Sequence, residues 1–168
     1  MRRTLLLLLV GALAVSCTQQ TRIIPATGVP TAELNDWLDE DADGSNRRVF
    51  AVLSVDGVEV PNAARNVQRV GFGAGAGTFP YLLARPIEAK EVTVRVIGRH
   101  LVNAPISEVF GRAKGTFQEL QGTLTFRPKP GGVYRVAGVL SAHGSEIWIE
   151  ESESKVRVSG SVKRRGDA

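Results

Sequence analysis

The strongest constraint on the fold is a series of short β-strand patterns separated by glycine and proline turns. The clearest is EVTVRVIG at residues 91–98, where valines alternate with polar residues. A period of two places one set of side chains in a core and the other in water. The inward set is Val92, Val94 and Val96, and the outward set is Thr93 and Arg95. The segment therefore predicts a strand with one buried face.

A second strong pattern is the nearly continuous apolar run at residues 49–55, which precedes Asp56-Gly57 and then residues 58–60. Asp-Gly is a favoured pair in two-residue hairpin turns. A continuous apolar run bounded by a turn is typical of a strand buried on both faces. We therefore expect a hairpin over residues 49–60, with its first strand buried on both sides.

Weaker strand patterns fill much of the remaining chain, and they occupy residues 67–72, 79–84, 117–127, 133–140, 147–150 and 155–162. Residues 85–90 indicate a turn, and residues 106–114 have a weak helical pattern. Roughly seven to nine short strands, with no long helix and no repeat, are typical of a sandwich. The prediction is all-β: an antiparallel β-sandwich of the immunoglobulin or transthyretin type over residues 49–162. A small open β-barrel is the alternative.

The first residues of the chain have the composition of a leader. Arg2 and Arg3 precede the apolar run LLLLLVGALAV at residues 5–15. That run is too short to cross about 30 Å of hydrocarbon comfortably. Small residues follow it, as they do at signal-peptide cleavage sites. Residues 1–16 are therefore predicted to be a cleaved signal peptide.

The cleavage region reads Leu13-Ala14-Val15-Ser16-Cys17 and resembles the bacterial lipobox. In that family diacylglycerol is attached to the cysteine thiol, the leader is cut before it, and the new N-terminus is often acylated. The resemblance implies an acyl lipid such as palmitate on Cys17 and no other cofactor. Ala14 departs from the usual leucine, although alanine is tolerated. An ordinary secretory signal that happens to contain a cysteine is the alternative.

The residue after the cysteine and the number of acyl chains bear on location. Two or three acyl chains hold a protein at a membrane almost permanently. By resemblance to Gram-negative lipoproteins, Thr18 rather than aspartate implies passage to the outer membrane, with the domain facing the periplasm. Cys17 is also the chain's one cysteine, so the domain beyond it has no internal disulfide.

Residues 17–48 are expected to form a lipidated, flexible tether. Polar residues, Gly28 and two prolines make a packed element unfavourable before residue 30. A short helix is expected after Thr31, with Leu34, Trp37 and Leu38 on one face. At the other end of the chain, residues 163–168 are expected to form a disordered tail.

An acidic segment at the end of this tether resembles part of a calcium loop. Asp39, Asp41, Asp43 and Gly44 match the opening D-x-D-x-D-G of an EF-hand loop. The twelfth position is Phe50, where a bidentate glutamate is required. Calcium binding by the three aspartates is therefore a weak candidate, and a solvated acidic turn is the favoured interpretation.

Charge and motif content exclude several function classes. The net charge of +4 falls to +2 without the arginines of the leader, which gives no basic footprint for nucleic acid. The glycine-rich run at residues 71–77 lacks the Gly-Lys-Ser/Thr of a phosphate-binding loop and is expected to join strands. No serine lies in a G-x-S-x-G elbow. We therefore expect a protein that is not an enzyme.

Three small groups remain as weak site candidates. Ser141, His143 and Glu146 are close in sequence and form a minimal hydrolase set. Glu150, Glu151 and Glu153 form an acidic run that could bind a cation or carbohydrate. Tyr134 and Trp148 are candidate ligand platforms, although core or edge positions are favoured for both.

Residues 56–149 resemble a group of uncharacterised proteobacterial lipoproteins. The matching motifs are Val55-Asp56-Gly57, the valine-alternating strand ending at Gly98, Ala104-Pro105-Ile106, Phe126-Arg127-Pro128, GGVYRVAG at 131–138 and SEIWIE at 145–150. The resemblance implies an envelope lipoprotein without a settled activity. A non-enzymatic interaction or envelope-maintenance module, with an envelope protein as possible partner, is the first hypothesis. A module that binds glycan, peptide or calcium is the alternative.

Overall fold

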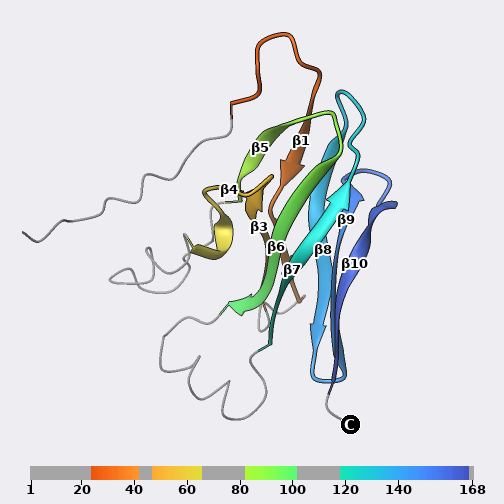
Figure 1. The fold of residues 1–168 in the computed structure, drawn as a ribbon. Helices are drawn as coiled ribbons and strands as arrows, with labels where there is room; N and C mark the ends of the chain where they lie inside the picture. The colour runs from red at the N-terminus through yellow and green to blue at the C-terminus, as the bar shows by residue number, and fades with distance from the viewer. Residues whose placement is uncertain (1–23, 42–46, 66–81, 102–117, 167–168) are drawn as a thin grey trace, which may run out of the picture.

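The computed structural model describes residues 24–41, 47–65, 82–101 and 118–166, and two β-sheets packed face to face make up this part of the chain (Figure 1). The first sheet has the strand order β10 (Arg157–Arg165), β9 (Gly144–Glu151), β8 (Val133–Ser141), β1 (Thr31–Asn35) and β5 (Ala84–Glu88). The second has the order β2 (Trp37–Glu40), β3 (Arg47–Val55), β6 (Val92–Leu101) and β7 (Glu119–Phe126), and β4 (Val58–Glu59) pairs with β3. The sheets do not close into a barrel, so the predicted sandwich is confirmed.

The strand pairing is antiparallel with one exception. β1 runs antiparallel to β5 but parallel to β8, with Glu33 opposite Val133 and Asn35 opposite Arg135. The first sheet is therefore mixed, whereas the sequence predicted antiparallel pairing throughout. The difference arises because β1 inserts between two strands that lie far from it in the chain.

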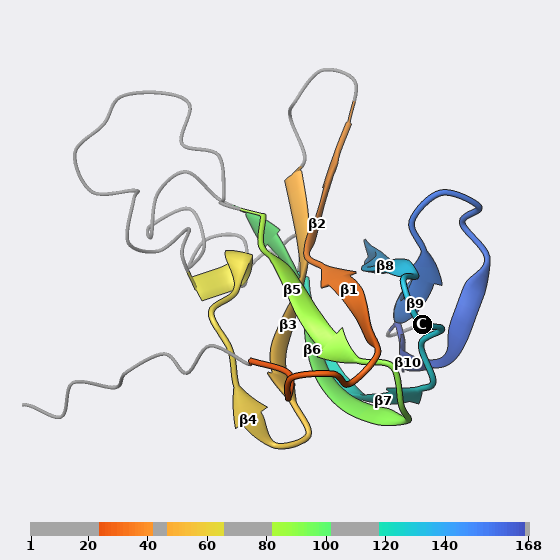
Figure 2. The same cartoon turned by 90° about the horizontal axis from the view of Figure 1, so that it is seen from above.

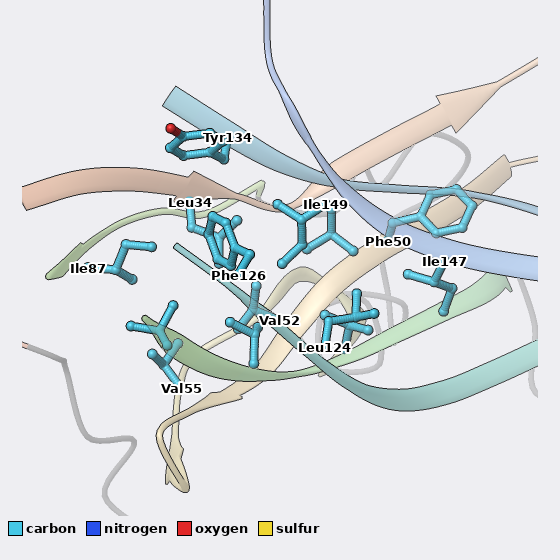
Figure 3. Close-up of a cluster of buried hydrophobic side chains, with 14 of the residues drawn as sticks. Leu34, Phe50, Val52, Val55, Ile87, Leu124, Phe126, Tyr134, Ile147 and Ile149 are labelled. Atoms are coloured by element: carbon cyan, nitrogen blue, oxygen red, sulfur yellow. The ribbon is translucent and has the colours of Figure 1, made fainter. Parts of the chain in front are cut away.

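The main core lies between the two sheets. Leu34, Phe126 and Ile149 meet there from three different strands (Figure 3). Phe50 is completely buried in the same layer, and two glycines make room for its ring. A Cβ on Gly98 would lie 2.9 Å from Phe50 Cδ1, and a Cβ on Gly138 would lie 2.5 Å from Phe50 Cε1. Both positions therefore exclude a larger side chain.

The hairpin predicted over residues 49–60 is present. Asp56 and Gly57 both have positive φ, at 48° and 81°, as a tight turn of this kind requires. The outer side of β3 is also covered, because Val49, Ala51 and Leu53 pack against Ala63 and Ala64 of a short helical segment at residues 63–65. This second cluster explains why the first strand of the hairpin is apolar on both faces.

The alternating strand is confirmed in detail. Val92, Val94 and Val96 are buried in β6, whereas Thr93 and Arg95 are exposed. In β7, Leu124 and Phe126 point into the same core, as their spacing predicted.

The expected tether and helix at residues 31–48 are wrong. β1 and β2 occupy residues 31–40, and β3 begins at Arg47. Ala32 and Leu34 are buried while Thr31 and Glu33 are exposed, so the period in β1 is two. The helical interpretation relied on Leu34, Trp37 and Leu38 and overlooked this shorter pattern, which tertiary pairing with β5 and β8 stabilises.

Two further boundaries differ from expectation. Residues 84–88 form β5 rather than a turn, and Arg85 and Ile87 point inward. Pro86 is accommodated because β5 is an edge strand, where a missing N–H group breaks no pairing. β10 continues to Arg165, into the segment expected to be a disordered tail, and pairs with β9 at Arg157 and again from Ser161 to Arg165.

Several sequence interpretations lie outside the described residues. They concern the leader and Cys17, Asp43 of the acidic segment, the patterns at 67–72 and 106–114, and the glycine-rich run at 71–77. No helix in the described ranges is long and apolar enough to span a membrane.

Candidate functional site

The point where the chain passes from one sheet to the other is fixed by a single buried residue, Asp36. β1 ends at Asn35 in the first sheet and β2 starts at Trp37 in the second, so the chain bends at residue 36 (Figure 2). The Asp36 N–H group donates to the Leu83 carbonyl oxygen at 3.0 Å, which holds the bend against the residues that lead into β5.

The Asp36 carboxylate collects three further donors. Oδ1 accepts from the Val52 N–H at 3.0 Å and from Arg85 Nη1 at 2.8 Å, and Oδ2 accepts from the Ala63 N–H at 2.8 Å. Arg85 Nη2 also donates to the Pro61 carbonyl oxygen at 3.0 Å. The side chains of Asp36 and Arg85 are 0% and 8% exposed. This buried ion pair therefore ties the bend to β3, β5 and the start of the helical segment.

A polar network crosses the outer face of the first sheet and connects both tryptophans. Trp148 Nε1 donates to Glu150 Oε2 at 2.7 Å, and Arg135 donates from Nε and Nη2 to Glu150 Oε1. The Arg135 guanidinium lies 3.8 Å from the centre of the Trp37 ring, and that of Arg157 lies 3.7 Å from the Trp148 ring. Each tryptophan therefore has an arginine stacked on it.

An open depression of about 360 Å³ lies beside this network, where β1 leaves the first sheet. We call it the Trp37 groove and define it by Glu33, residues 35–37, residues 82–84, Arg135, Ser152 and Lys155. Leu34 points into the core, so Glu33 and Asn35 on either side of it point to the outer face. Trp37 and Leu82 are both more than one third exposed, so the groove has an accessible apolar wall.

The polar atoms of the Trp37 groove are only partly satisfied. Asn35 Nδ2 donates to Glu33 Oε1 at 2.9 Å, but Asn35 Oδ1 is buried without a hydrogen-bond partner among the described residues. The same holds for Ser152 Oγ. A buried acceptor or hydroxyl without a partner costs about 1–3 kcal/mol, and such atoms are usually paired with protein, ordered water or a ligand.

Cations stand at one end of the groove. Lys155 lies in the turn between β9 and β10 and adopts the left-handed conformation, with φ of 60°. Its Nζ lies 5.8 Å from the centre of the Trp37 ring and donates to the Ser152 carbonyl oxygen. Arg135 keeps Nη1 outside its pair with Glu150. Two positive groups therefore approach the Trp37 ring.

A second depression of about 290 Å³ extends the groove along β1. It shares Glu33 and Ala84 with the first and continues past Pro86 to Gly131 and Gly132. Apart from Glu33, its lining side chains are small or of medium size, and the two depressions adjoin at Glu33 and Ala84 over the outer side of β1 and β5.

Neither aromatic residue singled out from the sequence forms this platform. Tyr134 is 3% exposed, its hydroxyl oxygen accepts from the Lys129 N–H at 2.9 Å, and its ring contacts Phe126 edge to face. Trp148 is 8% exposed and covered by Arg157. Their predicted core or edge positions are confirmed, and Trp37 is the tryptophan that lines a depression.

The hydrolase set does not assemble. Ser141 ends β8 and His143 lies in the tight turn before β9, and the Ser141 hydroxyl donates to the Gly144 carbonyl oxygen at 2.8 Å. Glu146 pairs with Arg157 at 3.0 Å and Lys163 at 3.5 Å on the outer face of the sheet. The serine hydroxyl is thus engaged by backbone, and the carboxylate by cations.

The acidic segment is neutralised by arginines. Arg48 forms ion pairs with Asp39 at 3.0 Å and with Asp41 at 2.6 Å, and Arg47 pairs with Glu40 at 2.7 Å. Within the described ranges, no three His, Cys, Asp or Glu side chains gather in a way that could hold a metal ion. Glu150, from the second acidic run, is buried and bound by Arg135 and Trp148.

Hydrogen bonds and nearby cations lower the pKa of two partly exposed carboxylates. The pKa of Glu146 lies below its ordinary value, chiefly because the Ser161 side chain hydrogen-bonds to the carboxylate, while burial opposes this effect and Arg157 and Lys163 reinforce it. Lys90, 2.6 Å from the Glu88 carboxylate, lowers the pKa of Glu88 in the same way, and its own pKa is raised.

Sequence reasoning missed Asp36, Arg85 and Trp37. A partial signal is the alternation of polar and apolar residues at 31–35, which is compatible with a strand that ends before Asp36 but is too short to exclude a helix. It could not have shown the pairing of Asp36 with Arg85, which lies 49 residues away in the chain.

No protein-family model, curated protein or solved structure significantly matches this chain.

Proposed function

We propose that this protein is a non-enzymatic lipoprotein of the bacterial cell envelope, anchored through Cys17 and resident at the outer membrane. The observation that carries this proposal is the N-terminal sequence, in which a cationic start and a short apolar run lead into Leu13-Ala14-Val15-Ser16-Cys17. The body of the protein serves there as an interaction or envelope-maintenance module.

The position of the first strand refines the proposal. β1 begins at Thr31, so the spacer between the lipid and the first sheet consists of residues 18–30 rather than 18–48. A chain of that length spans at most about 45 Å when fully extended. The sandwich would therefore work close to the membrane that holds the lipid.

The chemistry of the described residues supports a non-enzymatic role. The Ser141 hydroxyl is engaged by a backbone carbonyl, and Glu146 and Glu150 are neutralised by cations. A nucleophile needs a general base within hydrogen-bond reach, and Ser141 instead donates to Gly144. A second candidate function, ligand binding, is favoured by the Trp37 groove and its two unpartnered polar atoms.

The anchor is tested with the Cys17→Ser variant, expressed in a Gram-negative host. We expect the wild-type chain to incorporate labelled palmitate and to require detergent for extraction. We expect the variant to lack the label and to lose cleavage before residue 17. Ser16→Ala is the matched control, because it keeps the thiol and a small residue. A Cys17→Ser chain that is still processed before residue 17 and still sediments with membranes would refute lipidation.

The location is tested separately with Thr18→Asp. Density-gradient separation of inner and outer membranes should show the wild-type chain in the outer membrane and the variant retained in the inner membrane. Identical distributions of the two chains would contradict the sorting proposal while leaving lipidation intact.

A further inference from the structure

We propose that the Trp37 groove binds the carboxyl-terminal end of an extended peptide. The carboxylate would lie at the Lys155 end of the groove and the peptide chain would run along the outer face of β1. This inference rests on the described side chains and is independent of the lipid anchor.

The cationic end supplies a site for the carboxylate. Lys155 is exposed, and the groove also contains Arg135, whose Nη1 lies outside the pair with Glu150. Carboxylates form their strongest hydrogen bonds with such charged donors. The Lys155 ammonium already donates to the Ser152 carbonyl oxygen, so it is positioned at the groove rather than free in solvent.

The unpartnered oxygens match the backbone of a peptide. Asn35 Oδ1 can only accept, so it requires an N–H or O–H donor from a ligand. Ser152 Oγ can donate to a carbonyl oxygen as well as accept. A peptide offers alternating N–H and C=O groups beside its terminal carboxylate, and it can satisfy both atoms. Recognition of a terminal carboxylate together with backbone groups is an established mode of peptide binding.

The shape of the surface matches an extended chain. Leu82 and Ala84 provide an apolar wall for side chains, and the second depression continues past Pro86 toward Gly131 and Gly132. Small residues at that end leave room for a backbone to lie flat against the sheet. Glu33 lies in both depressions, and its carboxylate can accept from a further peptide N–H group.

The Trp37 ring favours a peptide over a carbohydrate. Sugars that bind to tryptophan lie on the face of the indole ring. Here the Arg135 guanidinium stacks on that ring at 3.8 Å, and Lys155 lies 5.8 Å from its centre. These cations compete with a sugar for the ring, whereas a peptide carboxylate is attracted to them.

The test uses the full-length chain in detergent micelles, with both tryptophans labelled with nitrogen-15. The chain contains two tryptophans, so the two indole N–H signals are assigned with the Trp148→Phe variant. Trp148 lies outside the groove and gives a second signal in the same sample, although its Nε1 donates to Glu150, which also binds Arg135. The probes are an acetylated tetrapeptide pool, randomised over apolar residues at its last two positions, with a free carboxylate or with an amide in its place. Trigalacturonate serves as the acidic carbohydrate.

We expect the free-acid pool to shift the Trp37 signal saturably, with an apparent dissociation constant of about 1 mM or below, and to shift the Trp148 signal less. Amidation of the peptides and the Lys155→Ala variant should each weaken binding by about tenfold. Lys163→Ala is the matched control, because it removes an exposed lysine outside the groove, and it should leave binding unchanged.

Three results would overturn the proposal. The first is no shift of the Trp37 signal with the free-acid pool at about ten times that concentration. The second is equal binding of the acid and amide pools, which would remove the role of the carboxylate. The third is saturable binding of trigalacturonate that Lys155→Ala abolishes while the peptides do not bind, which would assign the groove to acidic glycans.

Discussion

Replacing Asp36 with alanine should be among the most destabilising single changes in the described part of the protein. The substitution removes the acceptor of three hydrogen bonds, and it leaves the Val52 and Ala63 N–H groups without their partner. It also leaves the Arg85 guanidinium, whose side chain is 8% exposed, without its counter-charge. Water reaches such a site poorly, so solvent replaces little of what is lost.

The magnitude follows from the burial of the pair. Removing one member of a buried ion pair costs about 3–5 kcal/mol, because the remaining charge stays buried and uncompensated. Unsatisfied backbone N–H groups cost about 1–3 kcal/mol each, but local relaxation and the remaining Pro61 contact of Arg85 reduce the total. We therefore expect Asp36→Ala to lower the free energy of unfolding by about 4 kcal/mol, a large share of the roughly 5–15 kcal/mol that stabilises a typical domain.

Urea denaturation of the full-length chain in detergent, followed by the far-UV circular dichroism of the sheets, measures this change. The double variant Asp36→Ala/Arg85→Met should be less destabilised than the sum of the two single variants, by about 1–3 kcal/mol, because it leaves no buried charge. Glu59→Ala is the matched control, since Glu59 pairs with Arg65 and Arg95 at a site where all three side chains are about half exposed. It should change stability by less than about 1 kcal/mol. An Asp36→Ala loss no larger than that of the control would refute the reasoning.

Three other perturbations test the fold and the charged groups. Gly138→Ala places a Cβ 2.4 Å from the Glu146 carbonyl oxygen and should cost about 1–3 kcal/mol in urea unfolding, whereas Gly160→Ala, with nothing within 4 Å, should be near neutral. Because the folded pKa of Glu146 is depressed, its contribution to stability is fully present above the ordinary glutamate pKa of about 4.3 and is lost as pH falls through the folded value. The stability difference between wild type and Glu146→Gln should therefore shrink as the pH falls below that ordinary value, and a pH-independent difference would contradict this. Millimolar calcium should leave Trp37 fluorescence unchanged, because Arg48 neutralises the nearby aspartates, and a saturable response would contradict this.

Local patterns in the sequence were sufficient to predict features that depend on a single strand or turn. The alternation at residues 92–96 predicted which side chains of β6 are buried, and Asp56-Gly57 predicted the turn between β3 and β4. Both rest on physics that acts within a few residues: the pleat of a strand and the tolerance of positive φ. The number of short strands was then enough to predict a sandwich.

Pairing between distant segments determined which of the ambiguous segments form strands. β1 has five residues, and its neighbours β5 and β8 lie about 50 and 100 residues further along the chain. A five-residue segment carries too little pattern to separate a strand from a helix, so the partners decide. Pro86 likewise indicated a turn, because its place on a sheet edge could not be known without the strand order.

The exposure of the two tryptophans likewise depends on the tertiary structure. Trp148 lies between two isoleucines in the sequence and Trp37 between Asp36 and Leu38, and their different exposure is seen only in the folded chain. Trp148 lies on a central strand under Arg157, whereas Trp37 lies on β2 at the edge of the second sheet. The sequence therefore identified tryptophan as the type of residue to examine but selected the buried one.

The bend that fixes the fold also shapes the candidate site. Asp36 lies between Asn35 and Trp37, lines the Trp37 groove with them and is held by four hydrogen bonds from its backbone and carboxylate. A site held this firmly loses little conformational entropy when a ligand binds, so more of the contact energy appears as affinity. The buried charge of Asp36 is costly to maintain, and a hydrophobic pair could stabilise the sandwich as well. Retaining it is consistent with a requirement to hold Asn35 and Trp37 in fixed positions.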